Sequence, residues 1–287
     1  MGKTFRTHGY TDPSHDAIGQ RHLMISRLIQ GYVDKDPPQT RQPALPLAIF
    51  RKLHTRAISD LDKAVAHLAC GALFFGLRSC EYLKVPGKES NRRTRKIRLR
   101  NIVFRHKGEI IPHHKSIQKA DTVSITFENQ KNGEKMETVT QSSTGIDMCP
   151  VRAWAATVTR IHSYTGTTKD TPVDAFSVRG KMFSISSDVM RVYLRRASRD
   201  IGEQKLGFDI NLVGTHSIRS SFAMMLLLND EAESVVMKKG HWKSNAFLRY
   251  IRQQISNYGV NASRRMVQTA SDDFYVIPHI GKFKIEK

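Results

Sequence analysis

The residues of this 287-residue sequence whose types and spacing could best carry out chemistry lie in Gly214–Ile251, which reads GTHSIRSSFAMMLLLNDEAESVVMKKGHWKSNAFLRYI. His216 and Arg219 follow a Gly and a Thr that can start a helix, and their spacing of three predicts that both lie on one helix face near its first turn. His241 comes later, and Tyr250 follows it by nine residues. The apolar run between the two pairs predicts a buried helix that fixes both ends in space. Two basic groups, a second His and a Tyr would then face one small volume.

Each of these pieces also has a plainer interpretation. An H-x-x-R pair arises easily by chance in a basic chain. Tyr250 belongs to an i, i+3, i+4 pattern with Phe247, Ile251 and Gln254, and such an aromatic is more often part of a core than a nucleophile. The order and spacing of the whole set favour a functional site.

Another candidate cation, Arg78, lies at a break between two apolar segments. A strong buried helix is predicted from Ser59 onward (SDLDKAVAHLACGALFF), and Gly76 interrupts it just before Arg78. An isolated buried charge is very costly, so this guanidinium must reach a carboxylate or an anionic ligand. Glu81, three residues on, is the carboxylate that would make it a purely structural ion pair.

A predicted β-hairpin carries a further cation, Lys131. Residues 123–127 alternate between apolar and polar types and predict a strand. Asn-Gly at 132–133 is the strongest short hairpin signal, and 136–141 would be the return strand. Lys131 would therefore sit at an exposed tip from which its ammonium can reach into a groove. The alternative is an ordinary surface lysine, and Lys135 could take the same role.

Two basic segments are candidates for contact with phosphates. Residues 88–100 (KESNRRTRKIRLR) form either a solvated loop or a phosphate-contacting edge, and 187–200 predict a helix with one basic face. The predicted DNA-binding residues in these segments are Arg92, Arg93, Arg95, Lys96, Arg191, Arg195 and Arg196.

The overall composition points to a polyanionic partner. Lys and Arg number 46 against 26 acidic residues, which gives a formal net charge of +20. Nucleic acid is the first candidate and an anionic membrane surface the second. No apolar run reaches the roughly 18 residues of a spanning helix, and the N-terminus matches neither a signal peptide nor a myristoylation site, so no membrane association is predicted.

The cysteines and histidines do not predict a metal site. Cys70, Cys80 and Cys149 are odd in number and widely spaced, which is typical of reduced thiols in an intracellular protein. The pair His113-His114 has no acidic or thiol partner nearby in the sequence. We expect no bound metal and no cofactor.

The chain divides at a proline-rich connector. Residues 1–43 form an N-terminal arm with one helix predicted at about 21–33, and 44–287 form the main domain with a C-terminal tail. The predicted fold class of the main domain is α+β, mainly α, with a small antiparallel sheet inserted among helices.

In their order along the chain, these residues resemble the catalytic domain of the tyrosine recombinase (phage integrase) family. GLRSCEYL is similar to the first arginine box, with Arg78 as its arginine and Glu81 as the acidic companion. Lys131 is similar to the hairpin lysine, THSIR to the H-x-x-R box, GHW to the His/Trp position, and Tyr250 to the nucleophile at its usual spacing. The resemblance covers roughly residues 44–260, and GHWKSNAFLRYI is most like recombinases of crypton-type eukaryotic mobile elements.

The resemblance implies DNA strand breakage and rejoining through a 3′-phosphotyrosyl intermediate, without metal. It assigns the phosphate to Arg78 and Arg219, acid–base catalysis to His216, a further hydrogen bond to His241, and protonation of the leaving 5′-oxygen to Lys131. The implied partners are double-stranded DNA and further copies of the chain, as a tetramer on DNA. The implied compartment is intracellular, and the nucleus if the host is eukaryotic.

One departure from the family keeps two alternatives open. Members usually carry a complete helical core-binding domain, whereas only the arm over 1–43 precedes the main domain here, enough for a remnant of one. The chain would then be a truncated or domesticated DNA-binding protein without turnover. A second alternative is relaxation of DNA by a type IB topoisomerase-like enzyme. Tyr258 is the replacement nucleophile if Tyr250 is not the one.

Overall fold

A computed structural model describes residues 15, 20–21, 23–27, 42–85, 94–111, 114–129, 133, 135–229, 231–240 and 242. The chain divides into two compact units, Met1–Arg41 and Gln42–Lys287. In the first unit residues 23–27 are helical, within the range where the sequence predicts a helix. The candidate site residues all belong to the second unit.

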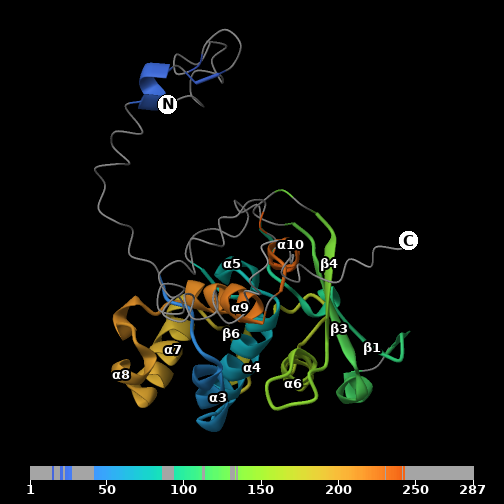
Figure 1. The fold of residues 1–287 in the computed structure, drawn as a ribbon. Helices are drawn as coiled ribbons and strands as arrows, with labels where there is room; N and C mark the ends of the chain where they lie inside the picture. Colours follow the sequence, from blue (N-terminus) through green and yellow to red (C-terminus); the bar gives the residue numbers. More distant parts are fainter. Residues whose placement is uncertain are drawn as a thin grey trace, which may run out of the picture. The chain divides into compact units, whose positions relative to one another are not determined.

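The described part of the second unit combines helices with two small antiparallel sheets (Figure 1). Its helices are α3 (Leu47–Thr55), α4 (Asp60–Phe74), α5 (Ser79–Tyr82), α6 (Pro150–His162), α7 (Ser187–Ile201), α8 (Glu203–Leu206), α9 (His216–Leu228) and α10 (Glu233–Lys239), with short 3-10 turns at Leu99–Asn101, His114–Lys119 and Ile210–Leu212. The strands are β1 (Ile102–His106), β2 (Glu109–Ile110), β3 (Thr122–Phe127), β4 (Glu137–Ser142), β5 (Ala175–Val178) and β6 (Lys181–Ser184). This arrangement confirms the predicted α+β, mainly α, class.

Helix α4 is the centre of the core. It packs against α3, α6, α7 and α9, and nine of its residues are buried. Gly71 lets α6 approach closely, because a Cβ there would lie 2.8 Å from Cε2 of the fully buried Trp154. Since α5 follows α4 directly and α9 packs on it, this one helix sets the relative position of Arg78 and Arg219.

The start of α4, which the sequence predicts at Ser59, is fixed by two polar side chains. The Ser59 hydroxyl accepts from the Asp62 amide at 3.1 Å, and the Asp62 carboxylate accepts from the Ser59 amide at 2.9 Å. These bonds satisfy amides at the helix end that have no partner within the helix. The Tyr193 hydroxyl donates to the same carboxylate at 2.6 Å, so the cap also joins α7 to α4.

The four-stranded sheet has the order β2-β1-β3-β4. The predicted strands appear as β3 and β4, paired antiparallel from Thr122↔Ser142 to Phe127↔Glu137. Lys131 belongs to the sequence between these strands and lies outside the described residues. The pairing of β3 with β4 is the hairpin that the Asn-Gly signal predicts.

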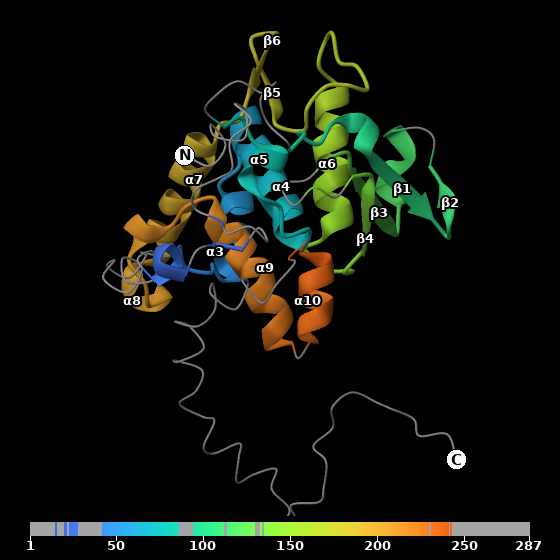
Figure 2. The same ribbon diagram turned by 90° about the horizontal axis from the view of Figure 1, so that it is seen from above.

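The second sheet, a hairpin of β5 and β6, is absent from the sequence-based prediction. Ala175 pairs with Ser184 and Val178 with Lys181. Figure 2 shows this hairpin standing out from the body, on the far side of α5 from α9. Its base is tied to the segment that leaves α5, because the Lys84 amide donates to Ile185 O at 2.9 Å and the Ser187 amide to Lys84 O at 3.0 Å.

Two histidines, one in α3 and one in α4, make the fold sensitive to acid. Burial, with help from the nearby His54, Arg160 and Lys63, lowers the pKa of His67 to about 4. Its ring centroid lies 5.5 Å from that of His54, whose pKa burial also lowers. The unfolded chain therefore binds protons between about pH 6.5 and pH 4 that the folded chain does not. Stability is complete above this window and falls as the pH decreases through it.

We expect the free energy of unfolding to drop by about 2 kcal/mol between pH 7.5 and pH 5 because of His67 alone. The measurement is urea unfolding at both pH values, compared with His67→Leu. The substitution should remove most of the pH dependence, since Leu does not titrate. An unchanged pH dependence in the variant would place the acid sensitivity elsewhere.

Candidate active site

Three segments that the sequence singles out meet at the side chain of Arg219. This residue lies in the first turn of α9 and is 1% exposed. Its Nη1 donates to the carbonyl of Gly76, two residues before Arg78, and its Nη2 donates to the carbonyl of Gly240, next to His241. The arginine box, the H-x-x-R box and the GHW segment therefore share one guanidinium.

The aromatic side chain of Trp242 covers this guanidinium. The Arg219 Cζ lies 3.9 Å from the Trp242 ring centroid, and the ring stacks on Phe222 with centroids 6.2 Å apart. A Cβ on Gly240 would lie 1.7 Å from the Trp242 ring, so the indole folds back over residue 240 only because that residue is glycine. His241 lies outside the described residues, and both of its chain neighbours contact Arg219.

The turn that leads into Arg78 is shaped by Gly76. It has a φ of +55°, and a Cβ there would lie 2.7 Å from the Phe222 ring. A left-handed φ strains other residue types, and here the space is also filled. Gly76 thus brings its carbonyl to Arg219 while it turns the chain from α4 into α5.

The ion pair between Arg78 and Glu81 is present. Arg78 Nη1 lies 2.9 Å from Glu81 Oε1, and the Arg78 amide donates to Oε2 at 2.7 Å. The Glu81 side chain is buried, whereas that of Arg78 is 17% exposed. Glu81 therefore fixes the direction of an arginine that still reaches the surface. The ion pair that the sequence offers as the structural alternative for Arg78 is therefore present.

The amino end of α9 is capped by a residue far away in the sequence. Thr215 makes no side-chain cap, contrary to what its type and position suggest. Instead, Gln42 Oε1 accepts from the amides of His216 at 2.8 Å and Ser217 at 3.2 Å. A Cβ on Gly214 would lie 2.4 Å from that oxygen, so the glycine makes room for the cap. His216 is half-buried and shares the first turn with Arg219, as predicted.

We expect Gln42→Ala to lower the free energy of unfolding by about 1 kcal/mol, because two amides at the helix end lose their acceptor. Gln42→Glu is the matched control. It keeps the acceptor and adds a negative charge that a helix amino end favours, so it should retain the stability. Urea unfolding measures both. Equal losses in the two variants would contradict the cap, because glutamate keeps both the volume and the acceptor oxygen of glutamine.

Five of the predicted site residues lie outside the described residues. They are Arg92, Arg93, Lys131, His241 and Tyr250.

The predicted basic face of α7 is divided between solvent and internal contacts. Arg191 is exposed and pairs with Asp188 at 2.8 Å. Arg195 donates through Nε to the Val213 carbonyl at 2.9 Å and through Nη2 to the Asn211 carbonyl. Arg196 is exposed. Arg195 therefore anchors the segment that leads into α9.

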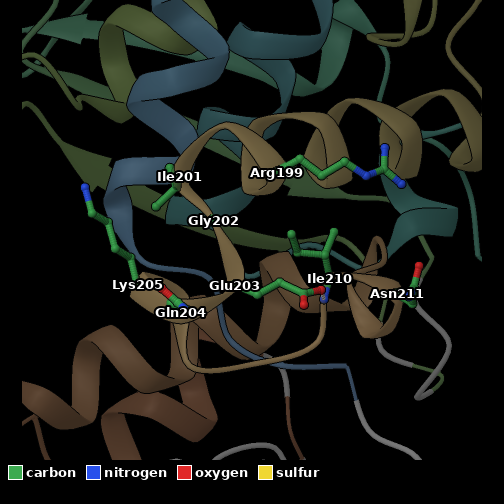
Figure 3. Close-up of a pocket in the computed structure, with 8 residues that line it drawn as sticks. All are labelled: Arg199, Ile201, Gly202, Glu203, Gln204, Lys205, Ile210 and Asn211. Atoms are coloured by element: carbon green, nitrogen blue, oxygen red, sulfur yellow. Dashed lines mark hydrogen bonds between the residues drawn. The ribbon is translucent and has the colours of Figure 1, made fainter.

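A cavity of about 570 Å³ lies where α7 ends and α8 begins (Figure 3). Figure 3 shows Glu203 turned toward Ile210, whose amide donates to it at 3.0 Å, and the side chains of Arg199 and Lys205 extending to either side. None of its lining residues is a predicted site residue. Its polar contacts stabilise the local turn.

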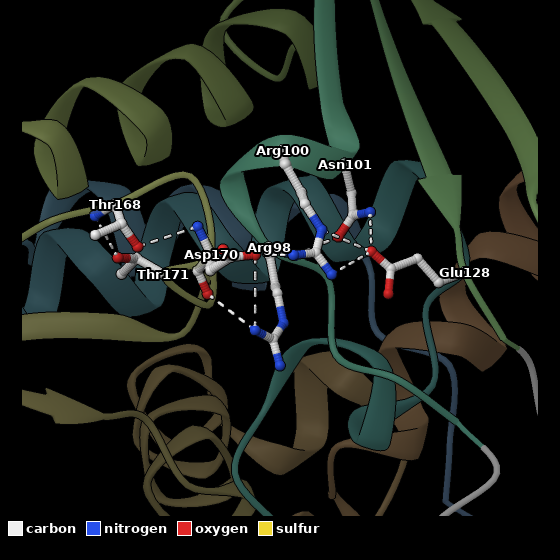
Figure 4. Close-up of polar contacts among 7 residues, drawn as sticks. All are labelled: Arg98, Arg100, Asn101, Glu128, Thr168, Asp170 and Thr171. Atoms are coloured by element: carbon white, nitrogen blue, oxygen red, sulfur yellow. Dashed lines mark hydrogen bonds and ion pairs between the residues drawn. The ribbon is translucent and has the colours of Figure 1, made fainter.

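The end of the basic run over 88–100 is also partly internal. Lys96 pairs with the fully buried Asp174 at 3.1 Å, while Arg95 is exposed. Figure 4 shows Arg100 between the carboxylates of Glu128, at 2.9 Å, and Asp170. Hydrogen bonds from Asn101 and Arg100 lower the pKa of Glu128, which keeps it charged. These pairs join the start of the sheet to the loop after α6.

The described residues show neither a metal site nor a membrane segment. Within them, no group of three or more His, Cys, Asp or Glu side chains is arranged to hold a metal ion. Among the described helices, none combines the length and the apolar character that crossing a bilayer requires.

Comparison with known proteins gives only distant likenesses. No protein-family model and no curated protein matches the chain. A solved structure of the Tn1549 transposon integrase in complex with circular intermediate DNA has a TM-score of 0.41 and 10% identity, covering 79% of this chain and 70% of that one. A variant of the same integrase in complex with transposon right end DNA also has a TM-score of 0.41, with 9% identity, covering 80% of this chain and 69% of that one.

Proposed function

We propose that this chain is a tyrosine recombinase that breaks and rejoins DNA strands, with Tyr250 as its nucleophile. The observation that carries the proposal is the meeting of the arginine box, the H-x-x-R box and the GHW segment at the Arg219 guanidinium. These segments lie far apart in the sequence and each contains residue types that can bind a phosphate, so their convergence supports one shared site. The net charge of +20 supports a nucleic-acid partner.

In the proposed reaction the Tyr250 oxygen attacks a backbone phosphorus and the bond to the 5′-oxygen breaks. His216 takes the phenol proton, and Lys131 gives a proton to the leaving 5′-oxygen. The product is a 3′-phosphotyrosyl link, which the 5′-hydroxyl of another strand can reverse. No oxidant, reductant or nucleotide is consumed.

The two arginines would stabilise the charge that develops on the non-bridging oxygens. Glu81 already directs the Arg78 guanidinium. Arg219 reaches the phosphate by exchanging the Gly240 carbonyl for a phosphate oxygen. A phosphate can accept two parallel hydrogen bonds from a guanidinium and neutralises its charge, which the neutral carbonyl does not. In the proposal, DNA binding thus rearranges the segment that contains His241.

The test is to incubate the purified protein with supercoiled plasmid in EDTA and to look for an SDS-resistant protein–DNA adduct. We expect the adduct with the wild type and with Tyr258→Phe, the matched control in the same part of the chain. We expect none with Tyr250→Phe, although its DNA binding should persist.

The other outcomes separate the alternatives. Salt-sensitive binding without any adduct would favour a DNA-binding protein without turnover. An adduct that requires Tyr258 instead would show that the nucleophile is wrongly assigned. Rapid complete relaxation of the plasmid by monomers, without joining of separate duplexes, would favour topoisomerase-like activity over recombination.

A further inference from the structure

The β5–β6 hairpin ends in a tight turn that carries an arginine. Arg179 and Gly180 form its two-residue loop with φ of +48° and +77°. Positive φ at both positions defines a type I′ turn, which favours Asn or Gly at the first position. Arginine in this conformation is strained by its Cβ. The same kind of turn occurs at Lys107 and Gly108, so the side chains around Arg179, rather than its backbone, distinguish this tip.

The side chains around the tip combine positive charge with apolar surface. The sequence from Ala175 to Ser184, AFSVRGKMFS, contains two cations and no acid. Val178, Met182 and Phe183 are exposed at 48%, 42% and 49%. Next to the base of the hairpin, Lys84 and Lys96 line a cavity of about 460 Å³ together with Met182 and Phe183. An apolar tip flanked by cations suits a polyanion that also offers apolar surface.

The base of the hairpin lies close to the candidate site. Lys84, which holds the base, follows the four-residue helix α5 that begins after Arg78. Standard rises place Lys84 within about 13 Å of Arg78, the step across to Ile185 adds about 5 Å, and the path along β6 to Arg179 adds about 19 Å. The tip is therefore within about 37 Å of Arg78, or about 11 base pairs of B-DNA.

We propose that the β5–β6 hairpin is a DNA-contacting ribbon that enters the major groove beside the cleaved phosphate. A two-stranded ribbon fits the width of this groove. Arg179 and Lys181 contact backbone phosphates on its edges, and Phe183, which shares a face with Val178, contacts base edges such as thymine methyl groups. This assignment rests on the proposed function for the position of the duplex.

The test compares Arg179→Gly with Lys107→Gly by fluorescence anisotropy on a labelled duplex from about 50 to 200 mM salt. Lys107 is the matched control, because it also precedes a glycine at an exposed hairpin tip, with φ of +50°. Both changes remove one charge and relieve a strained turn, so neither should lower the unfolding midpoint. Arg179→Gly should weaken binding about 3- to 10-fold and reduce the slope of log K against log salt by about 0.9. Lys107→Gly should leave both close to the wild type.

A second variant, Phe183→Ser, separates the apolar contribution from the charge. It should weaken binding without changing the salt slope, since no phosphate contact is lost. Arg179→Gly with wild-type affinity and slope would overturn the assignment, and so would equal losses in the two glycine variants.

The adduct assay distinguishes failure of this inference from failure of the proposed function. If adducts form and the hairpin variants bind like the wild type, only the hairpin assignment fails. If the Arg179 effect appears while no adduct forms, the hairpin still contacts DNA and only the strand-breaking activity fails. A wild-type chain without affinity for the duplex would overturn both.

Discussion

Replacing Arg219 with methionine should lower the free energy of unfolding by about 3 kcal/mol and abolish the covalent adduct. The substitution keeps most of the side-chain volume but leaves the carbonyls of Gly76 and Gly240 buried without their donor. Each buried acceptor that loses its partner costs about 1 to 3 kcal/mol. The contact with the Trp242 ring loses its cationic part as well.

Arg219→Lys should keep the charge but lose about 1 to 2 kcal/mol, because one ammonium does not reproduce the planar fork that spans both carbonyls. Arg191→Met is the control. This arginine is exposed, and its pair with Asp188 should be worth less than about 1 kcal/mol. Urea unfolding monitored by tryptophan fluorescence measures all three. If Arg219→Met unfolds at the wild-type midpoint, the guanidinium does not hold the three segments together.

Replacing Glu81 with alanine should cost about 3 to 5 kcal/mol, as expected when one partner of a buried ion pair is removed. The carboxylate accepts from both the side chain and the amide of Arg78, and it is almost completely buried. Its loss leaves Arg78 without the contact that directs it. We therefore expect the adduct yield to fall together with stability.

Glu81→Gln separates the charge from the hydrogen bond, since the amide oxygen still accepts from the Arg78 backbone. It should retain part of the stability that alanine loses. Adding Arg78→Ala to Glu81→Ala should cost little more, because the interaction is already absent. Fully additive losses in this double-mutant cycle would contradict a coupled pair. Thermal or urea unfolding of the four proteins supplies the cycle.

Local sequence signals predict much of the fold. The Ser59–Asp62 cap marks the start of α4, and Pro150 after Cys149 marks the start of α6. Alternation of apolar residues identifies β3. The cap and the proline act within one helical turn, and the alternation in β3 marks which of its faces is buried, so each signal can be read from a short stretch of sequence.

Contacts between residues that are far apart in the sequence could not be predicted from it. Gln42 caps α9 from 174 positions away, and Lys96 pairs with Asp174 across 78. Nothing in a local pattern distinguishes these side chains from solvated ones. The β5–β6 hairpin is missing from the sequence-based prediction for another reason. Its turn uses Arg-Gly in place of the recognisable Asn-Gly.

The candidate site combines features that local sequence predicts with contacts between distant residues that it does not. The H-x-x-R spacing predicts that His216 and Arg219 share the first turn of α9, and the Arg78–Glu81 pair is equally local. The acceptors of Arg219 are backbone carbonyls of glycines, whose sequence gives no sign of an arginine partner. Only the folded chain reveals that this arginine is buried.

The long separation between Arg219 and Gly76 has a consequence for synthesis of the protein. The two residues are 143 positions apart. At about 5 to 20 residues per second, a ribosome needs roughly 7 to 30 seconds to make the intervening chain. Throughout that time α4 has emerged while the helix that covers one of its faces has not. We expect the nascent chain to depend on chaperones during this interval, and the candidate site to form only once α9 has left the ribosome.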